Sequence, residues 1–232
     1  MTIAIIAAME QELKQLREHL INPQEKILLN QRFYRGTLEG QPVVISQCGI
    51  GKVNAALGTA LLINNFQPSL VINSGSAGAI ASNLNQGDVL IASAVAHHDV
   101  DVCAFGYEWG QVPGSPPRFA ADASARARAE AVAEALHFPV VSGLLVSGDQ
   151  FVHGGANLAR IREHFPDALA LEMEAAAIGQ CCQALNTPWL VLRAISDRAD
   201  GQASLSFEEF LPLAAARSAT LLQRLLRQWP PA

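Results

Sequence analysis

The stretch Leu171-Glu172-Met173-Glu174-Ala175-Ala176-Ala177-Ile178 places two carboxylates and a thioether where an apolar strand meets a helix. Residues 168–171 have the composition of a short buried strand, and residues 175–185 that of a helix packed on a sheet. Ligand sites of open α/β sheets lie at such strand ends, and a buried carboxylate needs a partner, which the vicinal hydroxyls of a ribose could supply. The alternative is a pair of acids that the helix dipole favours in the first turn.

Composition narrows the class of protein. The chain has 232 residues, half of them hydrophobic, which is enough for one good-sized core, so we expect a single domain over residues 1–232. The 16 basic and 21 acidic residues give a net charge of -5 with no basic run, which argues against nucleic acid as a partner.

The apolar runs, the first ten residues and the cysteines indicate the cellular compartment of the protein. No apolar run approaches the length of a bilayer span, so no membrane contact is expected. The first ten residues lack a basic region and reach Glu10 early, unlike a signal peptide. Four cysteines without a C-x-x-C suit a reduced, cytoplasmic protein with neither disulfides nor structural zinc.

Short β-rich runs alternate with helical ones along the chain, which predicts an α/β fold. Strands are expected at residues 2–8, 32–38, 42–47, 69–73, 88–102, 140–146, 168–171 and 189–194, and helices at 10–20, 52–66, 123–136, 157–165 and 175–185. A last helix is expected to begin near Ser206, where Ser206-Phe-Glu-Glu209 matches a capping box. Pro212 should kink that helix or restart it.

Three acids follow three separate predicted strands. Glu12, Glu174 and Asp197 would therefore meet at one edge of the sheet, which is how catalytic groups are assembled on this architecture. Near them, residues 74–79 form a predicted small-residue loop that includes Ser76. This loop is neither G-x-G-x-x-G nor a P-loop, so phosphate binding has weak support.

Other segments leave two readings open. His97-His98-Asp99-Val100-Asp101 resembles a metal cluster, with His97, Asp99 and Asp101 on one face of a strand, although a solvated strand end or subunit interface is the commoner meaning. The aromatic-rich loop at residues 103–119 is either a lid or interface arm, or an ordered surface loop. Phe151 could stack on a planar ring while the Val152 backbone reads its edge, or it could be a core residue.

Seven motifs together carry a resemblance that covers nearly the whole chain in order. They are Ala8-Met9-Glu10-x-Glu12, Ser46-x-Cys-Gly-Ile-Gly-Lys-Val53, Asn73-Ser-Gly-Ser-Ala-Gly78, Asp101-Val-x-Ala-Phe-Gly-Tyr107, Ser147-Gly-Asp-x-Phe151, Glu172-Met-Glu174 and Arg193-Ala-Ile-Ser-Asp197. The set resembles the bacterial 5'-methylthioadenosine/S-adenosylhomocysteine nucleosidases.

The resemblance implies a single-domain, three-layer α/β/α fold with a central mixed sheet, like that of nucleoside phosphorylases. It implies hydrolysis of the N-glycosidic bond of both nucleosides, and of 5'-deoxyadenosine, in methionine salvage and the recycling of S-adenosylmethionine by-products. It also implies a cytoplasmic homodimer that uses no cofactor and no metal.

The resemblance further implies roles for individual residues. Asp197 resembles the general acid and Glu12 the base that activates water. The ribose site would be formed by Glu174, Met173 and Glu172, with Ser76, Ala77, Gly78, Arg193 and Ser196 lining or supporting it. The adenine would contact Phe151 and Val152, the 5' group would contact Met9, Ile50 and Phe207, and the neighbouring subunit would contribute Val102, Phe105 and Pro113.

The chemistry also follows from the bond that breaks. An N-ribosidic bond cleaves through an oxocarbenium-like transition state, which needs one protonated and one ionised carboxyl, as in inverting glycosidases. A purine nucleoside phosphorylase needs cations around phosphate. The resemblance places Asn73 where those phosphorylases have an arginine, and Glu12 where they are cationic. A futalosine-type hydrolase is excluded less firmly, and a noncatalytic nucleoside sensor would be expected to lack one of the acids.

Overall fold

The computed structural model describes residues 1–29, 31–199 and 203–230, with only the backbone of residues 203–208. Its elements follow in the order β1 (Ile3–Ala7), α1 (Glu10–Glu18), β2 (Ile21–Leu28), β3 (Gln31–Leu38), β4 (Gln41–Gln47), α2 (Lys52–Phe66), β5 (Leu70–Ala79), β6 (Val89–His97), the 3-10 turn η1 (Cys103–Phe105), β7 (Phe119–Ala120), α3 (Ala123–Ala135), β8 (Val140–Ser147), α4 (Gly155–His164), β9 (Ala168–Glu172), α5 (Ala175–Ala184), β10 (Trp189–Asp197) and α6 (Ala203–Arg227). None of the described helices is long and apolar enough to cross a membrane.

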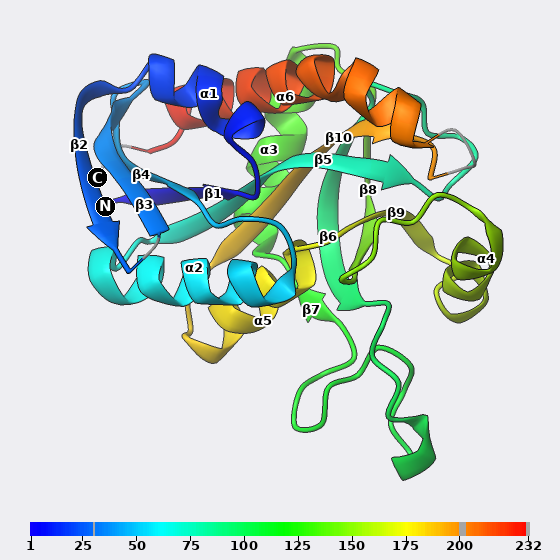
Figure 1. Cartoon of the computed structure of the whole chain (residues 1–232). Helices are drawn as coiled ribbons and strands as arrows, with labels where there is room; N and C mark the ends of the chain where they lie inside the picture. Colours follow the sequence, from blue (N-terminus) through cyan, green and yellow to red (C-terminus); the bar gives the residue numbers. More distant parts are fainter. Residues whose placement is uncertain (30, 200–202, 231–232) are drawn as a thin grey trace.

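One mixed sheet organises the molecule (Figure 1). Its central strand β1 is wholly buried and lies parallel to both β4 and β5, with Ile5 opposite Ile45 and Ile72. Strands buried on both faces are expected to be continuous apolar runs, as β1 is. Beyond β5 the sheet closes on itself, because β10 pairs with β5 and β6 while β6 connects through β8 and β9 back to β5.

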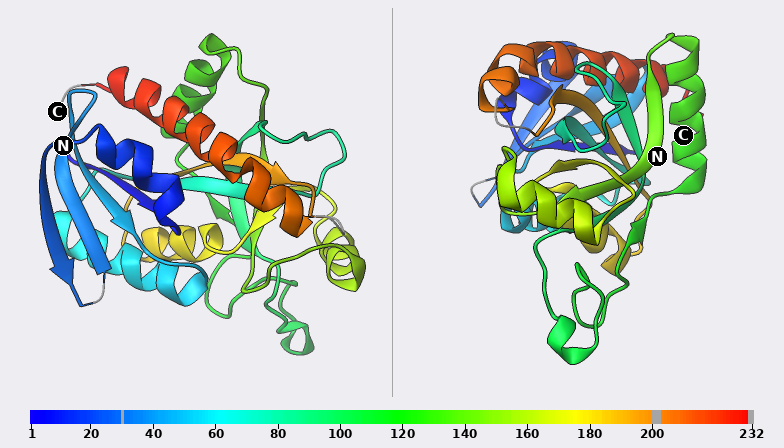
Figure 2. Two further views of the ribbon diagram at one scale, coloured as in Figure 1. Left: turned by 45° about the horizontal axis from the view of Figure 1, so that its top comes forward. Right: turned by 90° about the vertical axis from the view of Figure 1, so that its right-hand side faces the viewer.

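Helices cover both faces of the sheet (Figure 2). Helices α1, α3 and α6 pack on one face over a core that includes Leu13, Leu16 and Leu222. Helices α2 and α5 pack together on the other face, over a core that includes Leu62 and Ile178. The three-layer α/β/α fold expected from the sequence is therefore confirmed.

Most predicted elements lie within a few residues of their expected bounds. Helix α2 has the predicted bounds, and α3 begins as predicted, with Asp122 Oδ1 accepting a hydrogen bond from Ala125 N at 2.8 Å. Strand β2 was not predicted, because half of its sequence Ile-Asn-Pro-Gln-Glu-Lys-Ile-Leu is polar without strict alternation, and nearly all of it is exposed. It is an edge strand, where Pro23 is tolerated at an irregularity in the pairing.

The predicted small-residue loop at residues 74–79 was wrong, because this segment continues strand β5. All ten residues of β5 are buried, and β10 lies alongside nearly its whole length. Small side chains are needed there because neighbouring groups approach closely from the cavity side. Ser76 is thus held on a strand of the sheet rather than on a flexible turn.

Two further expectations fail at the ends of elements. Strand β6 ends at His97 rather than at residue 102, so strand alternation does not place Asp99 and Asp101 on the face of His97. Helix α6 begins at Ala203, which puts Ser206 inside the helix and removes the expected capping box. The helix continues through Pro212 and does not restart there.

Candidate functional site

A cavity opens where several strands end, and six segments of the chain line it. The lining residues are Ala8, Met9, Glu12, Ile50, Ser76, Ala77, Gly78, Gln150, Phe151, Val152, Leu171, Glu172, Met173, Glu174, Ser196 and Asp197. The structure therefore brings the three acids predicted from separate strands, Glu12, Glu174 and Asp197, to one cavity.

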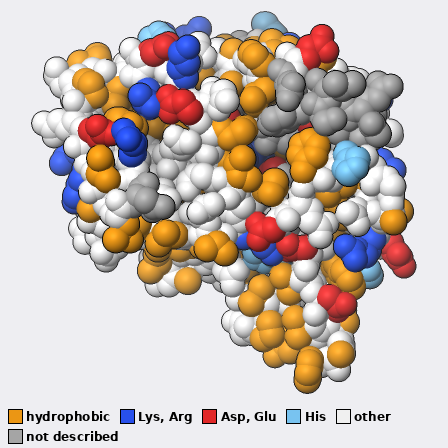
Figure 3. All heavy atoms as spheres, viewed as in Figure 1, with side chains coloured by type: hydrophobic (Ala, Val, Ile, Leu, Met, Phe, Trp, Pro, Cys, Tyr) orange, Lys and Arg blue, Asp and Glu red, His pale blue; other side chains and the backbone are white. Residues whose placement is uncertain are grey.

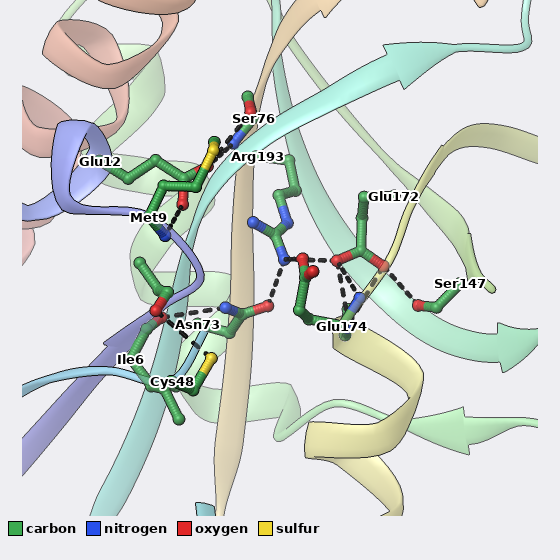
Figure 4. A network of polar contacts seen from close by, with 12 residues as sticks. Ile6, Met9, Glu12, Cys48, Asn73, Ser76, Ser147, Glu172, Glu174 and Arg193 are labelled. Atoms are coloured by element: carbon green, nitrogen blue, oxygen red, sulfur yellow. Dashed lines mark hydrogen bonds and ion pairs between the residues drawn. The ribbon is translucent and has the colours of Figure 1, made fainter. Parts of the chain in front are cut away.

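Glu12 is held in a fixed orientation by donors from two elements (Figure 4). Its Oε1 accepts hydrogen bonds from the backbone N and Oγ of Ser76 at 2.9 and 3.1 Å, and its Oε2 accepts from Met9 N at 3.1 Å. A Cβ atom on Gly75 would lie 2.6 Å from Glu12 Oε1 and 2.0 Å from Arg193 Nη1. Only glycine at position 75 lets both charged groups approach the strand so closely.

Glu172 caps the N-terminus of α5. Its carboxylate accepts hydrogen bonds from Glu174 N and Ala175 N at 2.9 Å, as well as from Ser147 Oγ and Arg193 Nη2. The dipole interpretation of the acidic pair thus holds for Glu172, whose oxygens are directed at donors of the chain itself. Arg193 is buried beneath the cavity and does not line it.

The surroundings of Glu174 disfavour its ionised form. Its Oε1 accepts a hydrogen bond from Gly51 N at 2.9 Å, and its Oε2 lies 3.8 Å from Arg193 Nη2. Burial and the neighbouring Glu172 carboxylate raise the pKa of Glu174 to about 8, although Arg193 and the Gly51 N–H act in the opposite direction. The surroundings of this carboxyl therefore favour its neutral form.

Asp197 lies at the end of β10, where its carboxylate is buried. Ser196 Oγ donates to its Oδ1 at 2.8 Å and Ala199 N donates to its Oδ2 at 2.9 Å. A Cβ atom on Gly78 would lie 2.9 Å from Asp197 Oδ2, so glycine is needed again where β5 passes the acid. The carboxyl is held by the chain while still facing the cavity.

The remaining walls are apolar and partly open. Val152 is buried, whereas Phe151 is 48% exposed and Ile50 is 51% exposed beside the cavity. Exposure of this size is unusual for a core phenylalanine, so the core interpretation of Phe151 does not fit the structure. These side chains offer an apolar surface against which a planar ring could pack.

Besides Arg193, three predicted site residues in the described part of the chain do not line this cavity. Val102, Phe105 and Pro113 belong to the loop between β6 and β7, which projects from the body of the protein (Figures 1 and 3). The side chain of Phe207 lies outside the described residues.

Sequence reasoning missed several residues that line or support the cavity. They are the lining residues Ala8, Gln150 and Leu171, and the supporting residues Gly51, Asn73 and Ser147. Asn73 Oδ1 accepts from Arg193 Nη2 at 2.7 Å, and its Nδ2 donates to Ile6 O at 3.0 Å. For Ala8, Gly51, Asn73 and Ser147 membership in the quoted motifs was the available signal, but a backbone donor such as Gly51 N leaves no side-chain signature.

The aromatic loop between β6 and β7 divides into two parts. Phe105 is 81% exposed, in η1 at the tip of the loop. Trp109, in contrast, stacks on His164 with ring centroids 3.9 Å apart and donates its Nε1–H to His98 O at 2.9 Å. Trp109 therefore anchors the loop to its own chain.

The His97–Asp101 segment does not gather metal ligands. Within the described residues, no group of three or more histidine, cysteine, aspartate and glutamate side chains is arranged to hold a metal ion. His97 instead contacts Gln180 Oε1 through Nε2 at 2.9 Å. Asp99 pairs with Lys52, with Oδ1 and Nζ 2.5 Å apart.

Comparisons with known proteins agree along the whole chain. The family model of the phosphorylase superfamily matches residues 2–227. A curated 5'-methylthioadenosine/S-adenosylhomocysteine nucleosidase of Anoxybacillus flavithermus is 49% identical over 229 residues, which cover 98% of this chain and 99% of the relative.

Solved structures give the same result. The nucleosidase from Neisseria meningitidis, in complex with methylthio-immucillin-A, has a TM-score of 0.96 at 48% identity, covering 98% of this chain and 99% of that chain. A futalosine hydrolase of Helicobacter pylori has a TM-score of 0.94 at 34% identity, covering 98% of each chain. These matches include every segment that lines the cavity.

Proposed function

The chain belongs to the 5'-methylthioadenosine/S-adenosylhomocysteine nucleosidase family of the phosphorylase superfamily, and from this premise we propose how its cavity hydrolyses the N-glycosidic bond of these nucleosides. The products are adenine and the 5-substituted ribose. The observation that carries the proposal is the convergence of Glu12, Glu174 and Asp197 on one cavity.

Asp197 acts on the leaving group. Adenine leaves readily only when it departs neutral, so a proton must reach one of its ring nitrogens as the bond breaks. Asp197 donates that proton. The hydrogen bonds from Ser196 Oγ and Ala199 N support this role by fixing the carboxyl at the cavity wall.

Glu12 acts on the water that attacks the sugar. It takes a proton from the water as the bond to the anomeric carbon forms, while the developing positive charge on the ribose is stabilised by the surrounding carboxylates. The three donors from Met9 and Ser76 support this role by holding the carboxylate in place. Neither step requires a metal or an organic cofactor.

The other cavity residues would position the nucleoside. Glu174 accepts the ribose hydroxyls with Met173 beside it, and Phe151 and Val152 hold the adenine. Met9 and Ile50 contact the 5' substituent, together with Phe207. The structure offers Glu174 as an acceptor at the cavity wall, since only one of its oxygens takes a hydrogen bond from a backbone amide among the described residues.

Water rather than phosphate is the proposed nucleophile. Phosphate would need cationic side chains beside it, but Glu12 lies there, and Asn73 makes its hydrogen bonds to Arg193 and Ile6. The same carboxylates would repel an anion.

We also propose that the enzyme is a cytoplasmic homodimer. The loop between β6 and β7 would complete the partner's cavity through Val102, Phe105 and Pro113. The 81% exposure of Phe105, together with exposed Val53 and Ile50 near the cavity, supports a subunit contact. Each of the four cysteines, all in the described part of the chain, is a free thiol, which suits a reducing compartment.

A substrate comparison tests the proposal against the futalosine-type alternative. Release of the free purine base is measured by absorbance with methylthioadenosine, S-adenosylhomocysteine, 5'-deoxyadenosine and a futalosine-type nucleoside at equal concentrations. We expect the first two to give the highest kcat/KM. A higher kcat/KM for the futalosine-type nucleoside would make the enzyme a futalosine-type hydrolase instead. We expect this outcome less, because the futalosine hydrolase is 34% identical to this chain and the curated nucleosidase 49%.

A further inference from the structure

Three residues outside the cavity form a closed ring of polar contacts beside it. The ammonium of Lys52 lies 2.5 Å from Asp99 Oδ1. The backbone N–H of Asp149 donates to Asp99 Oδ2 at 2.9 Å, and the backbone N–H of Lys52 donates to Asp149 Oδ1 at 2.7 Å. Each of the three residues is thus bonded to the other two.

The ring joins three segments that are far apart in the sequence. Lys52 is the first residue of α2, Asp99 follows the end of β6, and Asp149 follows the end of β8. The side chains of Lys52 and Asp99 are only 19% and 14% exposed, so their ion pair is largely desolvated. Such a pair holds its geometry better than an exposed one.

The segments that the ring joins carry two residues that line the cavity. Ile50 directly precedes the Gly51-Lys52 helix start, and Phe151 directly follows Asp149 and Gln150. Gly51 has a φ of 93°, and a Cβ atom there would lie 2.9 Å from Asp149 Oδ1. The turn at Gly51 therefore packs closely against the Asp149 carboxylate.

The same turn delivers a hydrogen bond to a cavity acid. Gly51 N donates to Glu174 Oε1 at 2.9 Å, one residue before the Lys52 N–H that donates to Asp149. The N-terminus of α2 is thus capped by two carboxylates from other segments, because its own first turn contains no acid. A shift of the turn away from Asp149 would remove the bond to Glu174 as well.

We propose that Lys52, Asp99 and Asp149 are positioning residues whose ring holds the Gly51 N–H against Glu174 and fixes the spacing of the Ile50 and Phe151 walls. The inference rests on the proposed function only in that the positioned group serves the ribose. It assigns a role to Lys52 and Asp149, which lie in two of the quoted motifs, and to Asp99 of the His97–Asp101 segment.

The ring should affect the ionisation of Glu174. The Gly51 N–H lowers the pKa of Glu174 against burial and against the charge of Glu172, with Arg193 also lowering it and Glu12 raising it. Cys48 is the other titratable group facing this acid, and burial raises the pKa of its thiol to about 12, so it stays neutral in the working range. Loss of the ring would therefore raise the pKa of Glu174.

The test compares Lys52→Met with Arg227→Met. The control removes an ion pair of similar length, Arg227 to Glu39 at 2.6 Å, that lies outside the cavity. In Lys52→Met we expect KM for methylthioadenosine to rise about tenfold, the size of one lost hydrogen bond to a charged group. The acid limb of kcat/KM should move to higher pH, while Arg227→Met should retain native values.

A second pair of variants separates positioning from general loss of stability. In Asp149→Asn the amide oxygen can still accept the Lys52 N–H, so this variant should remain close to native. Asp149→Ala removes the acceptor and should behave as Lys52→Met does. If Asp149→Ala and Asp149→Asn have the same KM and the same acid limb, the ring does not position the cavity.

A readout without turnover keeps this inference separate from the proposed function. The NMR amide resonance of Gly51 should titrate with Glu174 in the native chain and lose that dependence in Lys52→Met. If the native chain releases no adenine, the function is wrong, but this titration still tests the ring. An unchanged Gly51 titration in Lys52→Met would overturn the inference.

Discussion

Carboxylates outnumber cations around the cavity. Glu12, Glu172, Glu174 and Asp197 all line it, while the buried Arg193 contacts the two central acids from beneath. This imbalance is costly, because burial disfavours each ionised carboxyl. It suits a reaction in which positive charge develops on a bound sugar.

The two catalytic assignments predict loss of turnover from near-isosteric changes. Glu12→Gln and Asp197→Asn should each lower kcat by roughly 10²- to 10⁴-fold, because neither amide can carry out the proton transfer. Adenine release and product-inhibition constants for adenine are measured for both variants.

The matched control is Glu10→Gln. Glu10 lies in the same first turn as Glu12, but it forms an ion pair with Arg17 at 2.6 Å and does not line the cavity. Its replacement should leave kcat near native. Near-native turnover in Glu12→Gln or Asp197→Asn would remove that residue from its assigned role.

The raised pKa of Glu174 predicts a pH-dependent stability. Its folded pKa of about 8 exceeds the ordinary value of 4.5, so the unfolded state loses this proton first. The free energy of unfolding should therefore fall as pH rises from 4.5 towards 8 and then level off, by about 1.4 kcal/mol per unit of pKa difference. Glu174→Gln removes this contribution.

The free energy of unfolding of the native chain and of Glu174→Gln is measured by denaturant unfolding at about one-unit intervals over roughly pH 4–9. The stability of Glu174→Gln relative to the native chain should increase up to about pH 8 and stay constant above. The exposed Glu134→Gln serves as control. A difference that does not vary with pH would mean that Glu174 is not perturbed by its surroundings.

At this scale the sequence predicted the acids and only some of their supports. Glu12 and Asp197 could be found because a charged residue directly after an apolar strand is conspicuous. Gly51 and Gly75 could not be assigned, because one acts through its backbone N–H and the other through the absence of a Cβ atom. Such contributions depend on which strands lie opposite each other.

Among the elements, β5 is one whose sequence pattern led to a wrong prediction. Its second half, Ser74-Gly75-Ser76-Ala77-Gly78-Ala79, has the composition of a turn, because small residues and glycines usually mark loops. In the structure the same residues are small because Glu12, Arg193 and Asp197 pass close to the strand. Tertiary contacts override local propensity here.

The loop between β6 and β7 carries a prediction at the same scale. If Phe105 completes the 5' pocket of a partner subunit, Phe105→Ala should raise KM for methylthioadenosine several-fold more than KM for adenosine, which lacks the alkylthio group. Light scattering should show a native dimer. Leu185→Ala, at an exposed apolar residue after α5, is the control.

Mixed dimers sharpen this test. A heterodimer of Glu12→Gln and Phe105→Ala chains has one site with an intact Glu12 and an intact Phe105 from across the interface. That site should show native KM. Only the weakened KM of the Phe105→Ala parent, or full activity of a native monomer, would contradict the shared site.

At the scale of the whole molecule, closure of the sheet brings the residues that line the cavity together. Strand β10 pairs with both β5 and β6, which places Asp197 opposite Gly78 and within reach of the residues that follow β1, β8 and β9. The alternation of strands and helices was enough to predict an α/β fold, because it depends on local periodicity, whereas the three layers were expected from the family resemblance. Closure depends on pairings between distant strands, which one sequence read alone does not reveal.

The central claim is that water, activated by Glu12, attacks the sugar. The most direct measurement identifies the sugar released from methylthioadenosine, by mass spectrometry, in buffers with and without phosphate. We predict free 5-methylthioribose in both buffers, at the same initial rate. A dependence of the rate on phosphate, or a sugar 1-phosphate product, would contradict the account and make the enzyme a phosphorylase.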